Sequence, residues 1–106
     1  MKKSMSVSRP EPQAELVPIR RELILKLIDR LKEELSFYEL RIEFFRRKYG
    51  CELEELDARI EREGVPPDEK GHEIWDDSIE WHNAADEARC VRELLRELEE
   101  ALRKAS

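Results

Sequence analysis

The sequence predicts an all-α fold, a long antiparallel helical hairpin with a short middle helix. In two long segments, apolar residues recur at alternating spacings of three and four, the pattern of a helix that packs along a partner helix. Charged residues make up 43% of the 106 residues and only 3 are glycine, which fits surface-charged helices better than a sheet protein. The two segments match in length, so they are expected to pack against each other within a single helical domain, residues 18–106.

Residues 1–17 are expected to form a disordered tail, because they carry no periodic apolar face and prolines interrupt them. Pro18 suits the first turn of a helix, where its missing N–H costs nothing, so the first helix is predicted over about 19–49. Gly50 is expected to end this helix in a left-handed conformation. The apolar seam of the helix consists of Ile24, Ile28, Leu31, Leu35, Tyr38, Ile42, Phe45 and Tyr49.

A short second helix is predicted over about 52–63, with Cys51 in the capping position and Glu54 three residues later, as in a capping box. The Pro66-Pro67 pair cannot continue a helix and separates it from the third. Its apolar face consists of Leu53, Leu56 and Ile60. This face is expected to dock on a second apolar stripe of the first helix, formed by Phe37, Leu40 and Phe44.

The last helix is predicted over about 73–104, after a polar loop at 68–71. Its seam consists of Trp81, Ala84, Ala88, Val91, Leu95, Leu98, Leu102 and Ala105. Two helices alone leave one edge of each apolar face exposed to water, so the chain is expected to form a homodimer and complete a four-helix bundle. The dimer interface is expected on the long seams, at Ile24, Ile28, Leu31, Leu35, Val91, Leu95, Leu98 and Leu102.

Charge is distributed unevenly along the chain. Residues 51–87 carry 14 acidic and 3 basic side chains, whereas residues 1–50 carry 12 basic and 8 acidic ones. In a hairpin the acidic residues gather at one end, where they form either a solvated surface or a docking face for a basic protein. The basic runs at Arg20-Arg21 and Arg46-Arg47-Lys48 are short, so direct binding of nucleic acid is not expected.

The sequence predicts no catalytic, cofactor-binding or metal site. Residues 73–76 spell the ExxD half of the metal motif of helical nucleotide pyrophosphatases, but the EExxE half that holds magnesium with it is missing. His82 and Asp86 are one turn apart and are expected to pair with each other rather than to bind a metal, although metal binding by His72, His82 and the acidic cluster stays open. Neither Cys51 nor Cys90 belongs to a zinc motif, and both are expected to be free thiols.

Trp75 and Trp81 lie six residues apart and point in different directions, since each residue turns a helix by about 100°. Two interpretations are open: both seal the end of a thin core, or one anchors a protein partner. The residues predicted to bind a partner are Glu73, Trp75, Asp76, Asp77, Glu80 and Trp81.

Three short motifs carry a family resemblance. They are the FRRKYG turn at 45–50, the acidic EEL segment at 54–56 and the WDDSIEW start of the last helix at 75–81. Over about 35–102 the chain resembles the small all-helical antitoxin-like proteins of archaeal and bacterial toxin–antitoxin operons. The resemblance implies a non-enzymatic protein that neutralises a toxin, commonly a ribonuclease.

With no signal peptide or apolar span in view, a cytoplasmic location is expected. Two other functions stay open beside the antitoxin interpretation. One is a structural coiled-coil module that only oligomerises, and the other is a degenerate metal-dependent nucleotide hydrolase.

Overall fold

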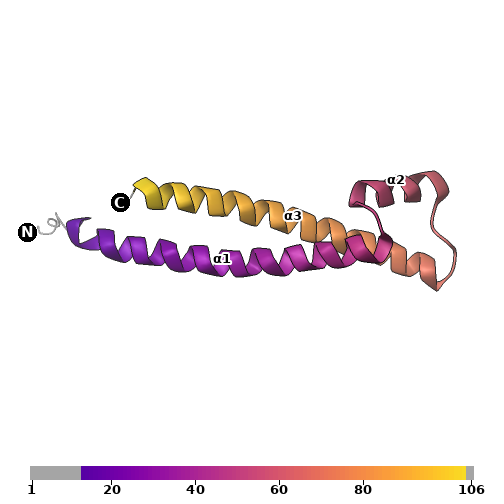
Figure 1. Cartoon of the computed structure of the whole chain (residues 1–106), viewed down its shortest axis with the longest axis horizontal. Coiled ribbons are helices and arrows are strands. Elements are labelled where there is room, and N and C mark those ends of the chain that lie inside the picture. The colour runs from indigo at the N-terminus through magenta and orange to yellow at the C-terminus, as the bar shows by residue number, and fades with distance from the viewer. Residues whose placement is uncertain (1–12, 105–106) are drawn as a thin grey trace, which may run out of the picture.

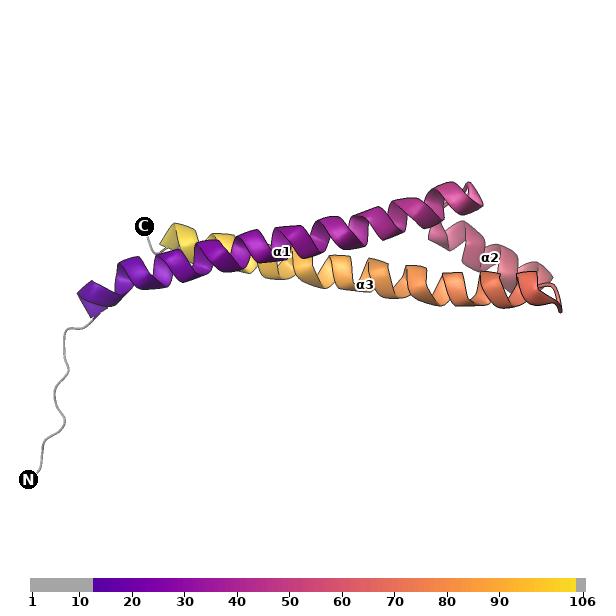
Figure 2. The same ribbon diagram turned by 90° about the horizontal axis from the view of Figure 1, so that it is seen from below.

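A computed structural model of the chain describes residues 13–104, which form three helices and, over that range, no strand. Helix α1 spans Gln13–Tyr49, α2 spans Leu53–Glu63 and α3 spans Glu69–Lys104. The antiparallel α1 and α3 give the molecule a long axis of 74 Å, and α2 lies at the end where α1 stops and α3 begins (Figures 1 and 2). The predicted all-α hairpin with a short middle helix is confirmed. None of the three described helices holds a stretch apolar enough to cross a lipid bilayer.

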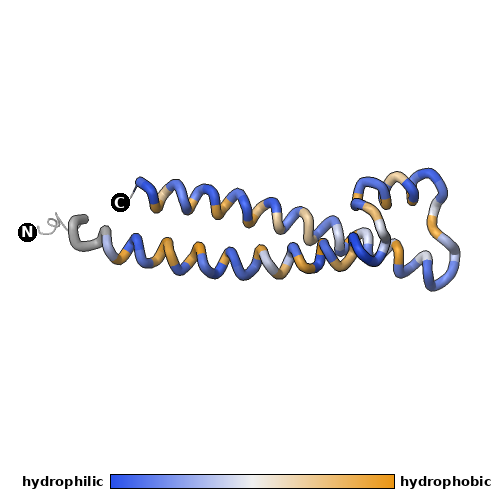
Figure 3. The backbone as a smooth tube through the Cα atoms, in the orientation of Figure 1, coloured by the Kyte–Doolittle hydropathy of each residue, from blue (hydrophilic) through white to orange (hydrophobic). Residues whose placement is uncertain are grey.

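The middle of the hairpin is held by the predicted seam between α1 and α3. Ile28, Val91 and Leu95 are buried there, and the apolar side chains that pack around them are Ile24, Leu31, Leu35, Tyr38, Leu98 and Leu102. Figure 3 shows the corresponding apolar bands repeating along both helices. All eight residues expected at a dimer interface therefore belong to a core cluster that α1 and α3 of one chain form together.

A second core lies at the α2 end of the hairpin. Leu53 and Leu56 of α2 are buried against Phe45 of α1 and Trp81 of α3. The rings of Phe45 and Trp81 are stacked, with centroids 5.8 Å apart and planes 21° apart. Helix α2 thus covers the Phe45–Trp81 stack at this end of the hairpin.

The predicted docking of α2 on the second stripe of α1 is wrong. Phe37, Leu40 and Phe44 stay 56%, 71% and 59% exposed. By packing on Phe45 and Trp81 instead, α2 removes from water apolar surface of two helices at once, which stabilises the fold more than covering one stripe of α1.

The start of α1 differs from the prediction. The helix begins at Gln13, so residues 13–17, expected in the tail, are helical and Pro18 lies inside the helix. A proline this close to the N-terminal end removes only one main-chain hydrogen bond, which a helix of 37 residues tolerates. The rest of the predicted tail, residues 1–12, lies outside the described residues.

The caps of α2 and α3 also shift. The N-cap of α2 is Glu52 rather than Cys51, and its backbone N–H donates to the Glu55 carboxylate at 3.4 Å. Helix α3 begins four residues before the predicted start, because the Asp68 carboxylate accepts hydrogen bonds from the backbone N–H groups of Lys70 at 3.0 Å and Gly71 at 3.3 Å. The loop expected at 68–71 is therefore a capped helical turn.

Gly71 marks the closest approach between α3 and the linker that follows α2. A Cβ atom at this position would lie 1.6 Å from the carbonyl oxygen of Pro66 and 2.7 Å from its carbonyl carbon. No side chain fits there without a backbone shift, so glycine fixes how closely the 64–68 linker folds back onto α3.

Candidate protein-binding site

The residues predicted to bind a partner lie on the first turns of α3, and the structure divides them into three groups. Trp81 is in the core, Trp75 and Asp76 are exposed, and three acidic side chains are paired with α1. Those paired acids are Glu73, Asp77 and Glu80.

Trp81 is a core residue and offers no surface to a partner. It is 2% exposed, and its ring stacks on Phe45 and on Tyr49, with a centroid distance of 6.3 Å to Tyr49. Its place in the 3–4 seam of α3 is the sequence signal for this burial. Of the two tryptophans, only Trp75, which is 53% exposed, remains a candidate for partner contact.

A polar cluster ties the end of α1 to the start of α3. The Lys48 ammonium donates to Asp77 Oδ2 at 2.6 Å and also bonds to Glu73, while the Tyr49 hydroxyl donates to the same Asp77 oxygen at 2.6 Å. One turn further along α3, Glu80 pairs with Arg41. Glu73, Asp77 and Glu80 therefore form ion pairs within the chain, and their basic partners are on α1.

The cluster raises two pKa values. Hydrogen bonds to Asp77 and then to Glu73 raise the pKa of Lys48, and burial followed by the hydrogen bond to Asp77 raises the pKa of Tyr49. In both cases the folded chain favours the protonated form of the side chain. Deprotonation of Tyr49 removes a donor that Asp77 uses, and deprotonation of Lys48 removes the positive charge beside it.

This arrangement predicts a loss of stability at alkaline pH. Since both folded-state pKa values are raised, the stabilisation is complete below about pH 10 and is lost as the pH rises further. The phenolate absorbance of the wild type minus that of Tyr49→Phe should show Tyr49 ionising above about pH 10. Asp77→Asn should bring this ionisation to lower pH, because it removes the negative charge beside the phenol. Ionisation of Tyr49 at its ordinary pKa would contradict the prediction.

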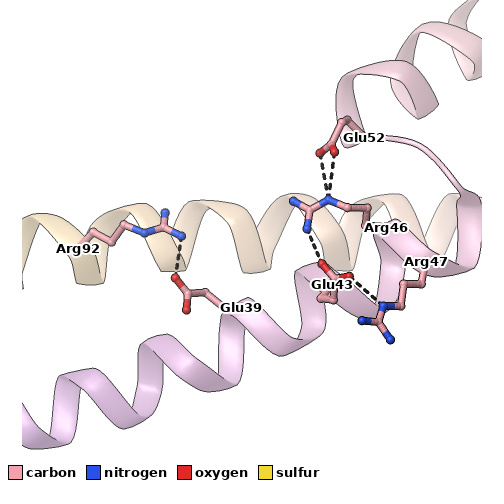
Figure 4. Close-up of polar contacts among 6 residues, drawn as sticks. All are labelled: Glu39, Glu43, Arg46, Arg47, Glu52 and Arg92. Atoms are coloured by element: carbon pink, nitrogen blue, oxygen red, sulfur yellow. Dashed lines mark hydrogen bonds and ion pairs between the residues drawn. The ribbon is translucent and has the colours of Figure 1, made fainter.

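The basic run at the end of α1 is also paired within the chain. Arg46 lies between Glu43 and Glu52 and contacts Glu52 at 3.1 Å, while Arg47 contacts Glu43 at 2.8 Å (Figure 4). The hydrogen bonds from Arg47 and then Arg46 lower the pKa of Glu43. The Arg46–Glu52 pair joins α1 to the N-cap of α2 and so helps to orient α2, a role the sequence did not predict.

Farther along the hairpin, Arg92 of α3 contacts Glu39 of α1 at 3.0 Å (Figure 4). The charges of the two long helices therefore meet along the flank of the seam as well as at its end. Antiparallel helices pair flanking positions in this way, but the partners are identified only once the register of the hairpin is known.

The predicted pairing of His82 with Asp86 is wrong. His82 Nε2 lies 2.7 Å from Asp57 Oδ2 of α2, and Asp86 instead accepts a hydrogen bond from Arg89 at 2.7 Å. The docking of α2 beside α3 brings Asp57 within reach of the imidazole. Over residues 13–104, no three His, Cys, Asp or Glu side chains gather closely enough to hold a metal ion, and Cys51 and Cys90 are free thiols.

The remaining candidate surface is the outer face of α3 near its start, which we name the Trp75 face and define by Trp75, Asp76 and Ile79. Ile79 is 47% exposed and follows Trp75 by one turn, while Asp76 is exposed and has no ion pair within residues 13–104. A groove beside Trp75 is lined by Val65, Pro66, Pro67, Asp68, Gly71 and His72. Ile79 was missed from the sequence, although its place outside the 3–4 seam is a signal of exposure.

Together these features define an all-helical hairpin protein with a crosspiece helix and an exposed aromatic and acidic face. By sequence the chain belongs to the Uncharacterized protein MJ0235 family, which matches residues 5–103. No curated protein and no solved structure gives a significant match to the chain.

Proposed function

We propose that the chain is a non-enzymatic protein-binding module that docks a basic partner on the Trp75 face. The observation that carries this proposal is the exposure of Trp75 and Ile79, one turn apart on a helix that Trp81 anchors in the core. Exposed aromatic and aliphatic side chains on a rigid element act as anchors at protein interfaces, and tryptophan is prominent among them.

The charge around this face supports a basic partner. Between residues 51 and 87, five acidic side chains have neither an ion pair nor a hydrogen bond in the described part of the chain, namely Glu54, Glu61, Glu69, Asp76 and Glu87. Unpaired surface charges of one sign attract a partner of opposite sign and speed its association. In this proposal Glu69 and Asp76 take the electrostatic role expected of Glu73, Asp77 and Glu80, which hold α1 and α3 together.

The partner we propose is a ribonuclease-type toxin, in keeping with the resemblance of the 45–50, 54–56 and 75–81 motifs to antitoxin-like proteins. A ribonuclease presents lysine and arginine side chains to RNA phosphates. A surface with acidic side chains around an apolar anchor can occupy the same site and exclude RNA. The chain acts in the cytoplasm in this proposal and needs no cofactor.

The proposal predicts which side chains a partner needs. With the full chain as bait in its own host, the wild type should retain a basic protein whose RNA cleavage it inhibits. Trp75→Ala combined with Asp76→Lys should weaken that complex by at least about 100-fold, because it removes the anchor and reverses an adjacent charge. Raising the salt concentration should slow association of the wild type.

Glu97→Lys is the matched control, because Glu97 is an exposed acid on α3 far from the Trp75 face. It should leave the complex unchanged. Retention of the same partner by the double variant would place binding elsewhere. Capture of no basic protein by the wild type would contradict the antitoxin function and leave the structural coiled-coil module.

A further inference from the structure

One face of α1 carries large apolar side chains that no other part of the described chain covers. We name it the Phe37 face and define it by Phe37, Leu40 and Phe44, which are 56%, 71% and 59% exposed. Their spacings of three and four place them on one side of the helix. Each phenylalanine ring is held by an edge-on contact with its neighbour, Phe37 with Tyr38 at 5.5 Å and Phe44 with Phe45 at 5.3 Å. An exposed apolar cluster of this kind marks an interaction surface.

The charges that flank the Phe37 face are arranged symmetrically about its centre. Glu33 and Arg47 lie seven residues before and after Leu40, so all three share one flank of α1. Glu33 is exposed and has no ion pair between residues 13 and 104. Arg47 has a side chain that is 80% exposed and contacts Glu43 through Nε, which leaves the outer edge of the guanidinium facing water. On the other flank, Glu34 and Lys48 repeat these signs at the same separation of 14 residues.

This order of residues is complementary to its own reverse. When two α1 helices lie antiparallel so that Phe37 of one meets Phe44 of the other, Glu33 of each copy lies beside Arg47 of the other, because a two-fold axis brings the same flank of each helix together. A two-fold symmetric interface requires such self-complementarity, because the same patch contributes both sides. Opposite charges at both ends of the patch fix the antiparallel register, and the apolar middle supplies the buried surface.

We propose that the Phe37 face is the interface of a symmetric homodimer in which the α1 helices of two copies pack antiparallel. The long seams expected at the dimer interface are used inside each hairpin, so the second copy takes this other face of α1. Glu33 and Arg47 set the register, and Leu40, midway between them, lies at the two-fold axis. This inference does not rest on the proposed partner or on the Trp75 face.

The first test removes the apolar centre. Leu40→Glu places two like charges at the two-fold axis of the dimer, and it should raise the dimer dissociation constant at least about 100-fold in sedimentation equilibrium of the full chain. Ile19→Glu is the matched control, since Ile19 occupies the same heptad position of α1 and is 62% exposed but lies outside the face. Both variants should keep the helicity of the wild type in circular dichroism, because both sites are exposed in the single chain.

The second test asks whether the charge pairs fix the antiparallel register of the dimer. Glu33→Arg and Arg47→Glu should each weaken the dimer by at least about 10-fold, because each puts two like-charge pairs into it. An equimolar mixture of the two variants should recover dimers, since both contacts then join opposite charges. A wild type that stays monomeric at high micromolar concentration overturns the proposal. So does a dimer that tolerates Leu40→Glu, or one that the mixture does not restore.

Discussion

Replacing Trp81 with alanine is expected to lower the free energy of unfolding by about 3–5 kcal/mol. Trp81 is 2% exposed and is the one side chain of α3 that stacks on two aromatic rings of α1 while also packing against α2. Its loss leaves a cavity between all three helices, and α2 has few other buried contacts with which to stay docked. Urea unfolding followed by circular dichroism gives the free energy.

Trp75→Ala is the matched control for this substitution, because the same side chain is removed from the same helix at an exposed site. Its effect should stay within about 0.5 kcal/mol. Tryptophan fluorescence adds a second measurement. In Trp75→Ala the remaining emission should be that of a buried indole, and in Trp81→Ala that of a solvated one. Equal losses of stability in the two variants would contradict the placement of Trp81 in the core.

The hairpin could be predicted from the sequence because its core depends on a regular period. The 3–4 spacing fixes which side of α1 and of α3 is buried, and both faces run the length of the helices. Ile28, Val91 and Leu95 are therefore buried as their spacing indicates. The ends of the helices were less certain, although Asp68 followed by an acidic first turn is a start signal that places α3 correctly.

The position of α2 could not be predicted in the same way. Its apolar face has only three residues, and several stripes on the long helices are wide enough to receive it. The choice between Phe44 and Phe45 as its neighbour turns on a rotation of about 100° around α1. That choice is decided by where Trp81 lies on α3, which is a relation between segments 36 residues apart in the chain.

The candidate site shows the same limit. The sequence shows an acidic region, but it does not distinguish the acids that pair with α1 from those that have no ion pair in the described part of the chain. Asp77 accepts hydrogen bonds from Lys48 and Tyr49, because the antiparallel register of the hairpin places it beside the end of α1. Its neighbour Asp76 is exposed and has no ion pair in the described part of the chain. Charge counts along the chain carry no information about such pairing, so only the folded arrangement reduces the candidate surface to the Trp75 face.

A buried charge in the middle of the seam should unfold the hairpin most completely. Leu95 is 8% exposed and packs with Ile28 and Val91 in the seam, outside the core cluster that α2 joins. Leu95→Glu removes a large apolar side chain and places a carboxylate among the apolar side chains of the seam. We expect a loss of about 4–5 kcal/mol, a large share of the stability of a domain of this size.

Leu94→Glu is the control for the Leu95 substitution, because the neighbouring leucine is 47% exposed and should tolerate the charge within about 1 kcal/mol. Helical circular dichroism and its urea midpoint should be measured at a protein concentration low enough to keep the wild type monomeric. Since this seam lies within one chain, the effect of Leu95→Glu should be undiminished there. A Leu95→Glu variant that is as stable as Leu94→Glu under those conditions would show that the seam contributes little to the single chain, and that a second copy is needed to bury it.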